Sequence, residues 1–305
     1  MYFLFFRRHT LWGLFCALFL GGSAGAQIQM SLQFPRNTYF LNEPTAAKLS
    51  ITNLAGRDLY FEDTPSRGTW CQLEVKNLRG GFVAPRKDTF SFPPLSVPSG
   101  QTVSRSIRLT DFFHLPEPGQ YQLRVSVFFS PTQSTFSAQS SFNADPGKLE
   151  WSQTVGIPDG RQNAGEYRTF SLFSMRRSEG IFLFATLEGK SEGIRFAPYP
   201  LGRTLSAMRP QAELDPRNNL NVFHALSDSE YALSQVNVDS GRFGQARYRS
   251  ATPRGGRPTL ARNEDGKLAI LGGVRITDEE IESQNSGRVL LSDRPNIVPA
   301  APRSR

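Results

Sequence analysis

The sequence predicts an all-β protein in which two modules follow a short leader. Apolar and polar residues alternate in short runs along the chain, and Pro, Gly, Asn and Asp residues separate these runs. No stretch between residues 30 and 145 has helical periodicity. We therefore expect an antiparallel sandwich over residues 27–145 and a β-meander over residues 146–292. Residues 293–305 lack apolar periodicity, so we expect a disordered tail.

The leader, residues 1–26, has the order of features found in a secretory signal peptide. A pair of arginines precedes an apolar run over residues 11–20, and small residues follow it. This pattern predicts cleavage between Ala26 and Gln27. The apolar run is shorter than the roughly 20 residues of a membrane-spanning helix, which argues against the alternative, an uncleaved anchor. We expect export to a periplasm or to the medium, with no membrane span once the leader is removed.

Two cysteines are present, and Cys16 lies in the predicted leader. Only Cys71 would remain in the exported protein, so no internal disulfide is possible. Cys71 begins a run in which Leu73 and Val75 alternate with polar residues. We therefore expect Cys71 to be a buried, small apolar residue of a strand.

The formal net charge of the chain is +8. This charge does not predict a nucleic-acid partner, because the 29 arginines and 6 lysines are scattered singly along the chain. Binding to phosphates usually requires basic residues clustered in a patch or stripe.

Period-two alternation predicts the strands of the first module. Four runs carry the pattern: residues 47–51, 103–109, 121–127 and 136–142. Arg105 is an exception, because it lies on the otherwise apolar face of its run. Alternation places one set of side chains against a core and the other toward water, as in a two-sheet antiparallel sandwich.

Two segments of the first module resemble bacterial immunoglobulin-like domains, including the macroglobulin-type and proteinase-inhibitor-like members. Residues 34–43, FPRNTYFLNE, resemble the opening strand and the turn that follows it. Residues 116–125, PEPGQYQLRV, resemble the Pro-Gly-x-Tyr corner near the end of such a domain. The resemblance implies a fold over residues 28–145 and little about function, because such sandwiches host adhesion, inhibition, chaperoning and spacing alike.

Trp70 is the one candidate binding residue of the first module. It precedes Cys71 and is expected on the opposite face of the strand, where an exposed tryptophan could anchor a partner. The alternative is that Trp70 packs under the loop over residues 80–94, since aromatic side chains contribute much of a core.

The second module is expected to consist of hairpins that repeat. Residues 167–175 pair with 181–187, residues 220–225 pair with 231–238, and a turn at Asp265-Gly266 precedes residues 267–271. An offset of 48 residues superposes turns and apolar runs, for example Arg209-Pro210 on Arg257-Pro258. Each unit weakly resembles a β-propeller blade.

The module is too short for a closed propeller, which needs four to eight blades. Two or three blade-like units fit residues 148–292. Three arrangements remain: small sheets packed on the sandwich, closure through a second copy, or a false repeat. Unpaired strand edges must be covered in a soluble protein, which favours the first arrangement. Near the end, Thr277 and the acids that follow predict a short capped helix, and a calcium-binding cluster is the alternative.

No catalytic, metal-binding or cofactor-binding motif was found. The predicted exported chain has two histidines, His114 and His224, and neither has a partner at the spacing of a triad or a zinc site. The acids of the second module that could act in pairs on a glycosidic bond are Glu166, Asp228, Glu230, Asp239 and Asp265. Asp239 and Asp265 precede glycines in turns, which explains them without catalysis.

These observations favour an exported, non-catalytic protein that binds or scaffolds a protein or glycan of the cell envelope. Two alternatives remain open. One is a carbohydrate-active or glycan-binding protein that uses the acids of the second module in a cleft lined by tryptophan. The other is a proteinase-inhibitor-like role for the first module, which would require an exposed, rigid loop.

Overall fold

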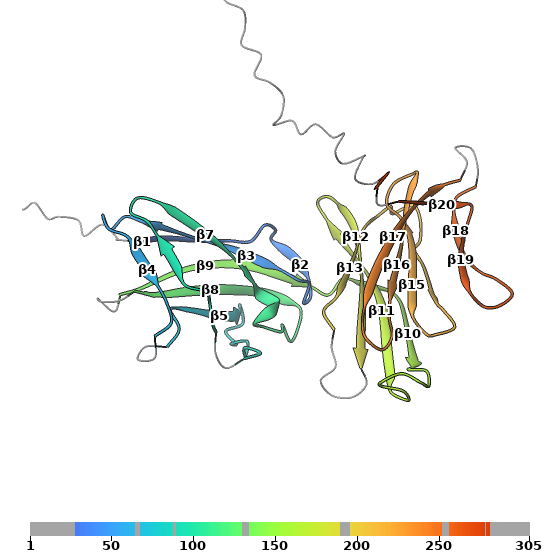
Figure 1. Cartoon of the computed structure of the whole chain (residues 1–305), viewed down its shortest axis with the longest axis horizontal. Helices are drawn as coiled ribbons and strands as arrows, with labels where there is room; N and C mark the ends of the chain where they lie inside the picture. Colours follow the sequence, from blue (N-terminus) through green and yellow to red (C-terminus); the bar gives the residue numbers. More distant parts are fainter. Residues whose placement is uncertain are drawn as a thin grey trace, which may run out of the picture.

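The computed structural model is all-β, as predicted, and consists of several mainly antiparallel sheets. Two groups of sheets lie side by side along the long axis of the molecule (Figure 1). The predicted leader, its cleavage pair Ala26 and Gln27, and the predicted tail lie outside the described residues. The structure describes residues 28–64, 68–87, 90–129, 134–189, 196–251, 256–277 and 279–280.

The described residues of the first module form nine strands and one turn of 3-10 helix. They are β1 (Ile28–Gln33), β2 (Thr38–Phe40), β3 (Ala46–Asn53), β4 (Leu59–Phe61), β5 (Cys71–Asn77), β6 (Leu95–Val97), β7 (Thr102–Arg108), η1 (Leu109–Asp111), β8 (Gly119–Phe129) and β9 (Ser134–Asp145).

Two sheets of the first module enclose one apolar core. One has the order β1-β3-β7 and the other β2-β9-β8-β5, where only the pair β2 and β9 is parallel. A separate pair joins β4 to β6. Leu49 and Ile51 of one sheet belong to the same buried cluster as Leu123 and Val125 of the other.

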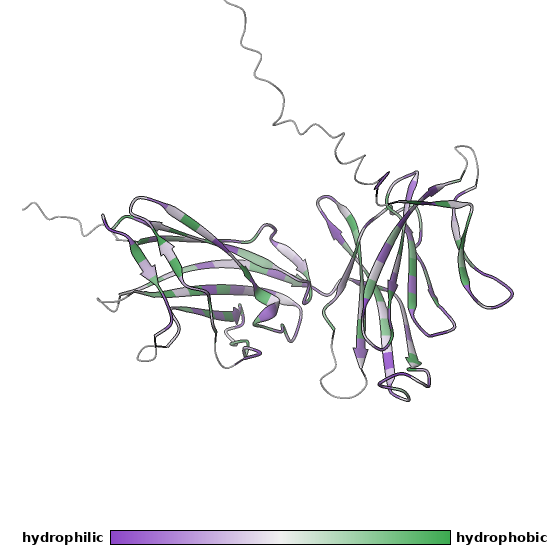
Figure 2. Cartoon of the chain, in the orientation of Figure 1, coloured by the Kyte–Doolittle hydropathy of each residue, from purple (hydrophilic) through white to green (hydrophobic). Residues whose placement is uncertain are grey.

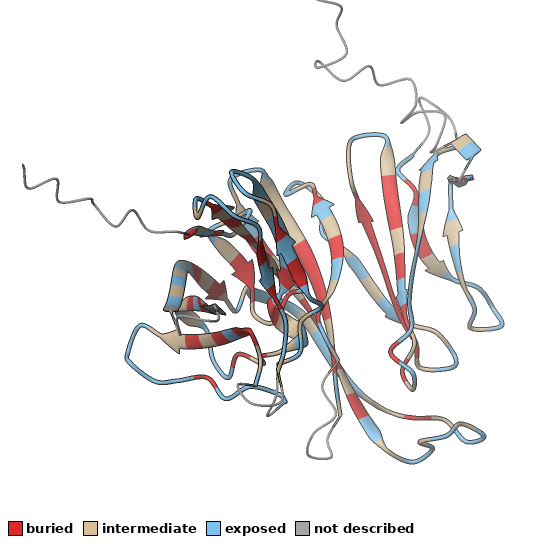
Figure 3. Cartoon of the chain, turned by 60° about the vertical axis from the view of Figure 1, so that its left-hand side comes forward, coloured by how far each residue is buried: buried red, intermediate tan, exposed pale blue. Residues whose placement is uncertain are grey.

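The predicted alternation is confirmed in β5 and β8. Tyr121, Leu123, Val125 and Val127 are fully buried, and residues between them are more exposed (Figure 3). At the start of β8, the Tyr121 hydroxyl donates a hydrogen bond to the main-chain oxygen of Glu117 (2.6 Å). This bond ties the corner over residues 116–121 to the strand.

In the second module, the part that the structure describes forms eleven strands. They are β10 (Lys148–Gly156), β11 (Tyr167–Arg177), β12 (Gly180–Gly189), β13 (Tyr199–Thr204), β14 (Gln211–Leu214), β15 (Leu220–Ala225), β16 (Glu230–Val236), β17 (Phe243–Ser250), β18 (Thr259–Arg262), β19 (Leu268–Leu271) and β20 (Gly273–Ile276).

These strands form three layers. Strands β10 to β13 form a meander, the order β14-β15-β16-β17-β20 forms a second sheet, and β18 pairs with β19. One apolar cluster joins Phe170 and Leu183 of the first layer to Val222 of the second. Another joins Phe223 of the second layer to Leu260 of the third. Buried and less buried residues alternate along β11 of the first layer, whereas β15 of the second layer, which has a layer on each side, is buried at every position. Figure 2 shows the hydropathy of these strands.

Two hairpins of the second module have the same register, and their paired residues are separated by the predicted offset of 48 residues. In the hairpin β14–β15, Gln211 lies opposite Phe223 and Leu214 opposite Leu220. In β18–β19, Thr259 lies opposite Leu271 and Arg262 opposite Leu268, which is the same register displaced by the offset. Both turns contain a residue with positive φ, Asn218 (58°) and Gly266 (76°). The sheets around the hairpins differ, because β18–β19 has no further strand.

Pro146 and Gly147 alone separate the last strand of the first module from β10. Gly147 has a φ of 68°, and a Cβ atom there would lie 2.9 Å from the ring of Phe40 and 3.0 Å from the main-chain oxygen of Ser174. The ring of Phe40 in turn stacks on Phe184 of β12, with centroids 4.6 Å apart. The modules are therefore packed against each other at this joint.

A buried ion pair crosses the same joint. The carboxylate of Glu43 accepts hydrogen bonds from Arg177 of β11, from Arg36 (3.1 Å) and from the amide of Phe40 (3.0 Å). The guanidinium of Arg177 also lies over the rings of Phe182 and Phe184. These contacts explain why β11 extends through Arg177, two residues beyond the end predicted from sequence.

Candidate ligand-binding cavity

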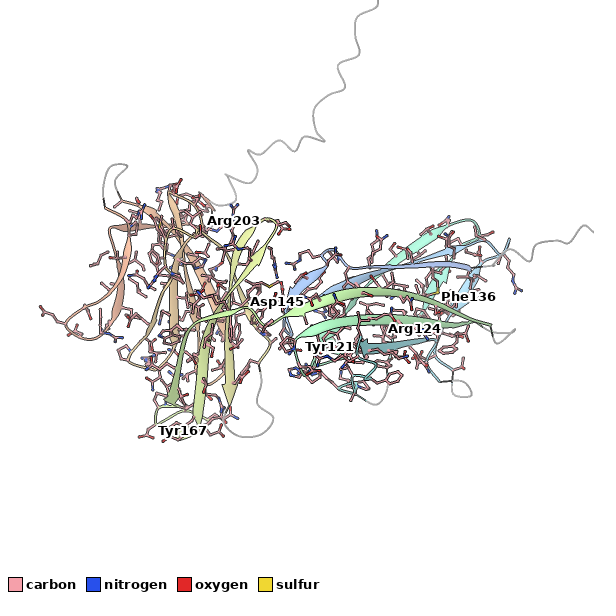
Figure 4. All side chains as sticks on the ribbon, turned by 180° about the vertical axis from the view of Figure 1, so that it is seen from behind. Tyr121, Arg124, Phe136, Asp145, Tyr167 and Arg203 are labelled. Carbon is pink, nitrogen blue, oxygen red and sulfur yellow. The ribbon has the colours of Figure 1, made fainter. Side chains whose placement is uncertain are left out.

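A cavity of about 610 Å³ lies at the end of the second module that adjoins the linker. Figure 4 labels Asp145 at this junction and Tyr167 at the far end of β11. The cavity is lined by the start of β10, the end of β11, the start of β12 and the segment that follows β13. The lining side chains that carry charge are Asp145, Lys148, Glu150, Arg176 and Arg209.

Strand register places the lining residues in two rows across the sheet. Ser174 of β11 lies opposite Lys148 of β10 and opposite Leu183 of β12. Directly opposite residues of neighbouring strands project to the same face. Since Leu183 belongs to the core between the first two layers, this row faces the second layer.

The second row extends the same face toward the linker. Ile181 of β12 lies between Arg176 of β11 and Thr204 of β13. Thr204 is buried, and its hydroxyl has no hydrogen-bond partner among the described residues. The cavity is thus a continuation of the apolar core, bordered by polar groups.

Glu150 is held as an anion inside the cavity. Its Oε1 atom accepts a hydrogen bond from the Ser174 hydroxyl (2.6 Å) and lies 3.3 Å from the ammonium of Lys148. The bond from Ser174, followed by the interactions with Lys148, lowers the pKa of Glu150. Asp145 is also engaged, because its Oδ1 atom accepts the amide of Gly147 (2.7 Å).

Two smaller cavities are weaker candidates for a ligand-binding site. One, of about 350 Å³, lies beside β5 and β8 near Phe82, and another, of about 310 Å³, lies between the modules. The arginines of the latter are already paired. Arg86 donates to the main-chain oxygen of Thr110 (3.2 Å), and Arg108 pairs with Asp111 (3.0 Å).

Trp70 lies in the core and does not offer an exposed anchor. Only 3% of its surface is accessible, its indole N–H donates to the main-chain oxygen of Phe92 (3.2 Å), and its ring packs on Phe61. The alternative, that Trp70 packs under the loop over residues 80–94, is confirmed, since its ring also lies against that of Phe92. Because β5 begins at Cys71, Trp70 precedes the strand and the alternation of faces does not apply to it.

Cys71 is buried, as predicted, and its thiol is protected from reaction. Burial, with a smaller effect of Asp63, raises the pKa of this thiol to about 12. In native residues 27–305 we expect no modification of Cys71 by a thiol reagent such as dithionitrobenzoate, and full modification in denaturing guanidinium chloride. A matched control is Gln72→Cys, which places a thiol on the exposed face of the same strand. Rapid modification of native Cys71 would contradict this expectation.

The candidate acids of the second module do not converge on one site. Glu166 pairs with the buried guanidinium of Arg168 (2.6 Å). Asp239 accepts the side-chain amide of Asn163 (2.5 Å). Asp228 and Glu230 lie at the turn between β15 and β16, which adjoins the end of β13 through the bond from the Leu205 amide to Ala225.

The remaining candidate residues, Asp265 and the two histidines, lie at separate places in the structure. Asp265 lies in the turn between β18 and β19, as predicted. His224 is buried in β15, while His114 lines the cavity between the modules. Among the described residues, no three His, Cys, Asp or Glu side chains gather as metal ligands would.

The predicted cap at Thr277 is confirmed. The Thr277 amide donates to the carboxylate of Glu280 (3.0 Å), and the Glu280 amide donates to the Thr277 hydroxyl (3.3 Å). This reciprocal pair is a capping box. Residues 279 and 280 are helical, and the rest of the predicted helix lies outside the described residues.

No family model and no curated protein matches this chain. In the part of the chain that the structure describes, there is no helix with the length and apolar character needed to cross a membrane.

Proposed function

We propose that the chain is an exported, non-catalytic binding protein of the cell envelope, and that its ligand occupies the cavity beside the linker. The observation that carries the proposal is the preformed cavity itself. Its volume of about 610 Å³ lies in the range of small-molecule sites, roughly 300–1,000 Å³. Apolar side chains border it together with five charged ones, so the cavity is more polar than most small-molecule sites.

The state of the cavity acids supports binding rather than hydrolysis. A carboxyl group that acts as a general acid requires a raised pKa. The pKa of Glu150 is instead lowered by Ser174 and Lys148, so Glu150 remains an ion that positions its neighbours. Asp145 is used in the turn at Gly147.

We also propose that the first module is an immunoglobulin-like sandwich, which would act as the support of this site. The bond from the Tyr121 hydroxyl to Glu117 supports this assignment. A tyrosine at the start of a late strand, bonded to the main chain a few residues upstream, is a hallmark of such domains.

The function is tested on purified residues 27–305 by thermal melting with a panel of neutral sugars, acidic sugars, short peptides and aliphatic acids. We expect one class to raise the melting temperature without being consumed. Ile181→Trp fills the cavity and should abolish this rise. Leu149→Trp, at an exposed position of β10 that does not line the cavity, should preserve it.

Two results would overturn the proposal. One is hydrolysis of a glycoside, peptide or ester that a single substitution such as Glu166→Gln removes. The other is stabilisation by a ligand to the same extent in both tryptophan variants.

A further inference from the structure

We infer that the cavity selects an amphiphilic anion, a small molecule with an acidic head group on an apolar body. This inference rests on the proposed function, because it names the ligand class of the same cavity. Two arginines, Arg176 and Arg209, carry it.

Neither arginine forms an ion pair or a side-chain hydrogen bond with a described residue. Arg176 lies on the row with Ile181 and Thr204, and Arg209 lies on the segment after β13. Both side chains are exposed at the cavity. The positive charge of Lys148, in contrast, is already balanced by Glu150.

The guanidinium of Arg176 faces the cavity without a carboxylate partner, and that of Arg209 attracts Glu150 less strongly than Lys148 does, so both are suited to an acidic ligand. The planar set of donors of a guanidinium matches the two oxygens of a carboxylate or phosphate. The Thr204 hydroxyl, one strand beyond Ile181, is an additional buried donor with no partner among the described residues. These groups are interspersed with apolar lining residues, since Ile181 lies between Arg176 and Thr204, and the head group would bind to them.

The apolar side chains that line the cavity favour a ligand with an apolar body. They are Ile181, Leu183, Leu205 and Met208, and Leu183 belongs to the core between two layers. Contact with these side chains would remove an apolar body from water, which favours binding. An inorganic anion would leave these side chains uncovered, and a neutral apolar molecule would leave the arginines without a partner.

The test measures binding of octanoate to purified residues 27–305 by calorimetry. Octanol, which keeps the chain and lacks the charge, and inorganic phosphate, which lacks the chain, are the comparison ligands. We expect octanoate to bind at least about tenfold more tightly than either, because charged hydrogen bonds and apolar burial both contribute. Binding of octanoate should weaken as salt concentration rises.

Variants distinguish the cavity arginines from general positive charge. Arg176→Gln combined with Arg209→Gln should weaken octanoate binding by about tenfold or more. Arg203→Gln removes an exposed arginine of the same sheet that does not line the cavity, and should change binding by less than about twofold. Arg176→Lys should recover only part of the affinity, because an ammonium lacks the planar set of donors.

The outcomes separate this inference from the proposed function. If octanol binds as tightly as octanoate, or if the double substitution has no effect, the inference is wrong. If a neutral sugar or peptide binds and Ile181→Trp abolishes its binding, the cavity is a site but not an anion site. If Ile181→Trp does not abolish the binding of any ligand, the proposed function fails as well.

Discussion

Glu43→Ala is expected to lower the free energy of unfolding by about 3–5 kcal/mol, the usual cost of removing one partner from a buried ion pair. The side chains of Glu43 and Arg177 are 7% and 6% exposed. Burial lowers the pKa of Arg177, and Glu43 opposes this effect, so removal of the carboxylate would leave a buried cation with only its ring contacts and the weaker attraction of Glu179. Urea denaturation followed by far-ultraviolet circular dichroism measures the loss.

Substitution of the partner residue, Arg177, should lower the free energy of unfolding by a smaller amount. In Arg177→Met, Glu43 retains its bonds to Arg36 and to the amide of Phe40. In the double variant Glu43→Leu with Arg177→Met, no buried charge remains, and stability should return to within about 1 kcal/mol of the unmodified protein. A double-mutant cycle over these variants gives the coupling energy of the pair.

Glu43→Ala should also cause the two modules to unfold separately. Residues 27–305 contain two tryptophans, Trp70 in the first module and Trp151 in β10. In a Trp151→Phe background, fluorescence reports on the first module alone. We expect its transition to coincide with the dichroism transition when Glu43 is present and to separate from it in Glu43→Ala. Coincident transitions together with a loss below about 1 kcal/mol would contradict this account of the joint.

Acidification is expected to destabilise the protein through His224. This side chain is 2% exposed, and neither ring nitrogen has a hydrogen-bond partner among the described residues. Burial lowers its pKa to about 4, whereas an unfolded chain has a histidine pKa near 6.5. Between these values the unfolded state binds a proton that the folded state does not. Stability is therefore complete above pH 6.5 and falls as the pH decreases toward 4, by about 3 kcal/mol.

His224→Leu should remove this contribution. The variant should be at least as stable as the unmodified protein at pH 7, because it replaces an unpaired buried imidazole with an apolar side chain. At pH 4 it should be more stable by about 3 kcal/mol. His114→Leu provides the control for a histidine outside the core. The expectation is wrong if His224→Leu and the unmodified protein lose the same stability between pH 7 and pH 4.

The strands could be predicted from sequence because alternation is a local signal. The residues of β8 show this clearly, since every second side chain from Tyr121 to Val127 is fully buried. The hairpin turn at Gly266 was also predictable, because its φ of 76° requires a residue that tolerates that conformation. The sequence leaves both an exposed and a buried position open for Trp70, because the alternation begins one residue later and sequence alone does not set that boundary.

The cavity could not be predicted from the sequence. Its rows form only when β10, β11, β12 and β13 pair, so Lys148, Ser174, Arg176 and Thr204 share no spacing that a motif would reveal. The sequence predicts Arg176 in the connection between two strands for a similar reason. The strand continues past it because Arg177 meets Glu43 of the other module, a contact between residues far apart in the chain.

The short connection at Pro146 and Gly147 holds the two modules in a fixed relative orientation. The direction in which the cavity opens is therefore fixed relative to the sandwich, because the stacked rings and the ion pair at the joint resist rotation of one module against the other.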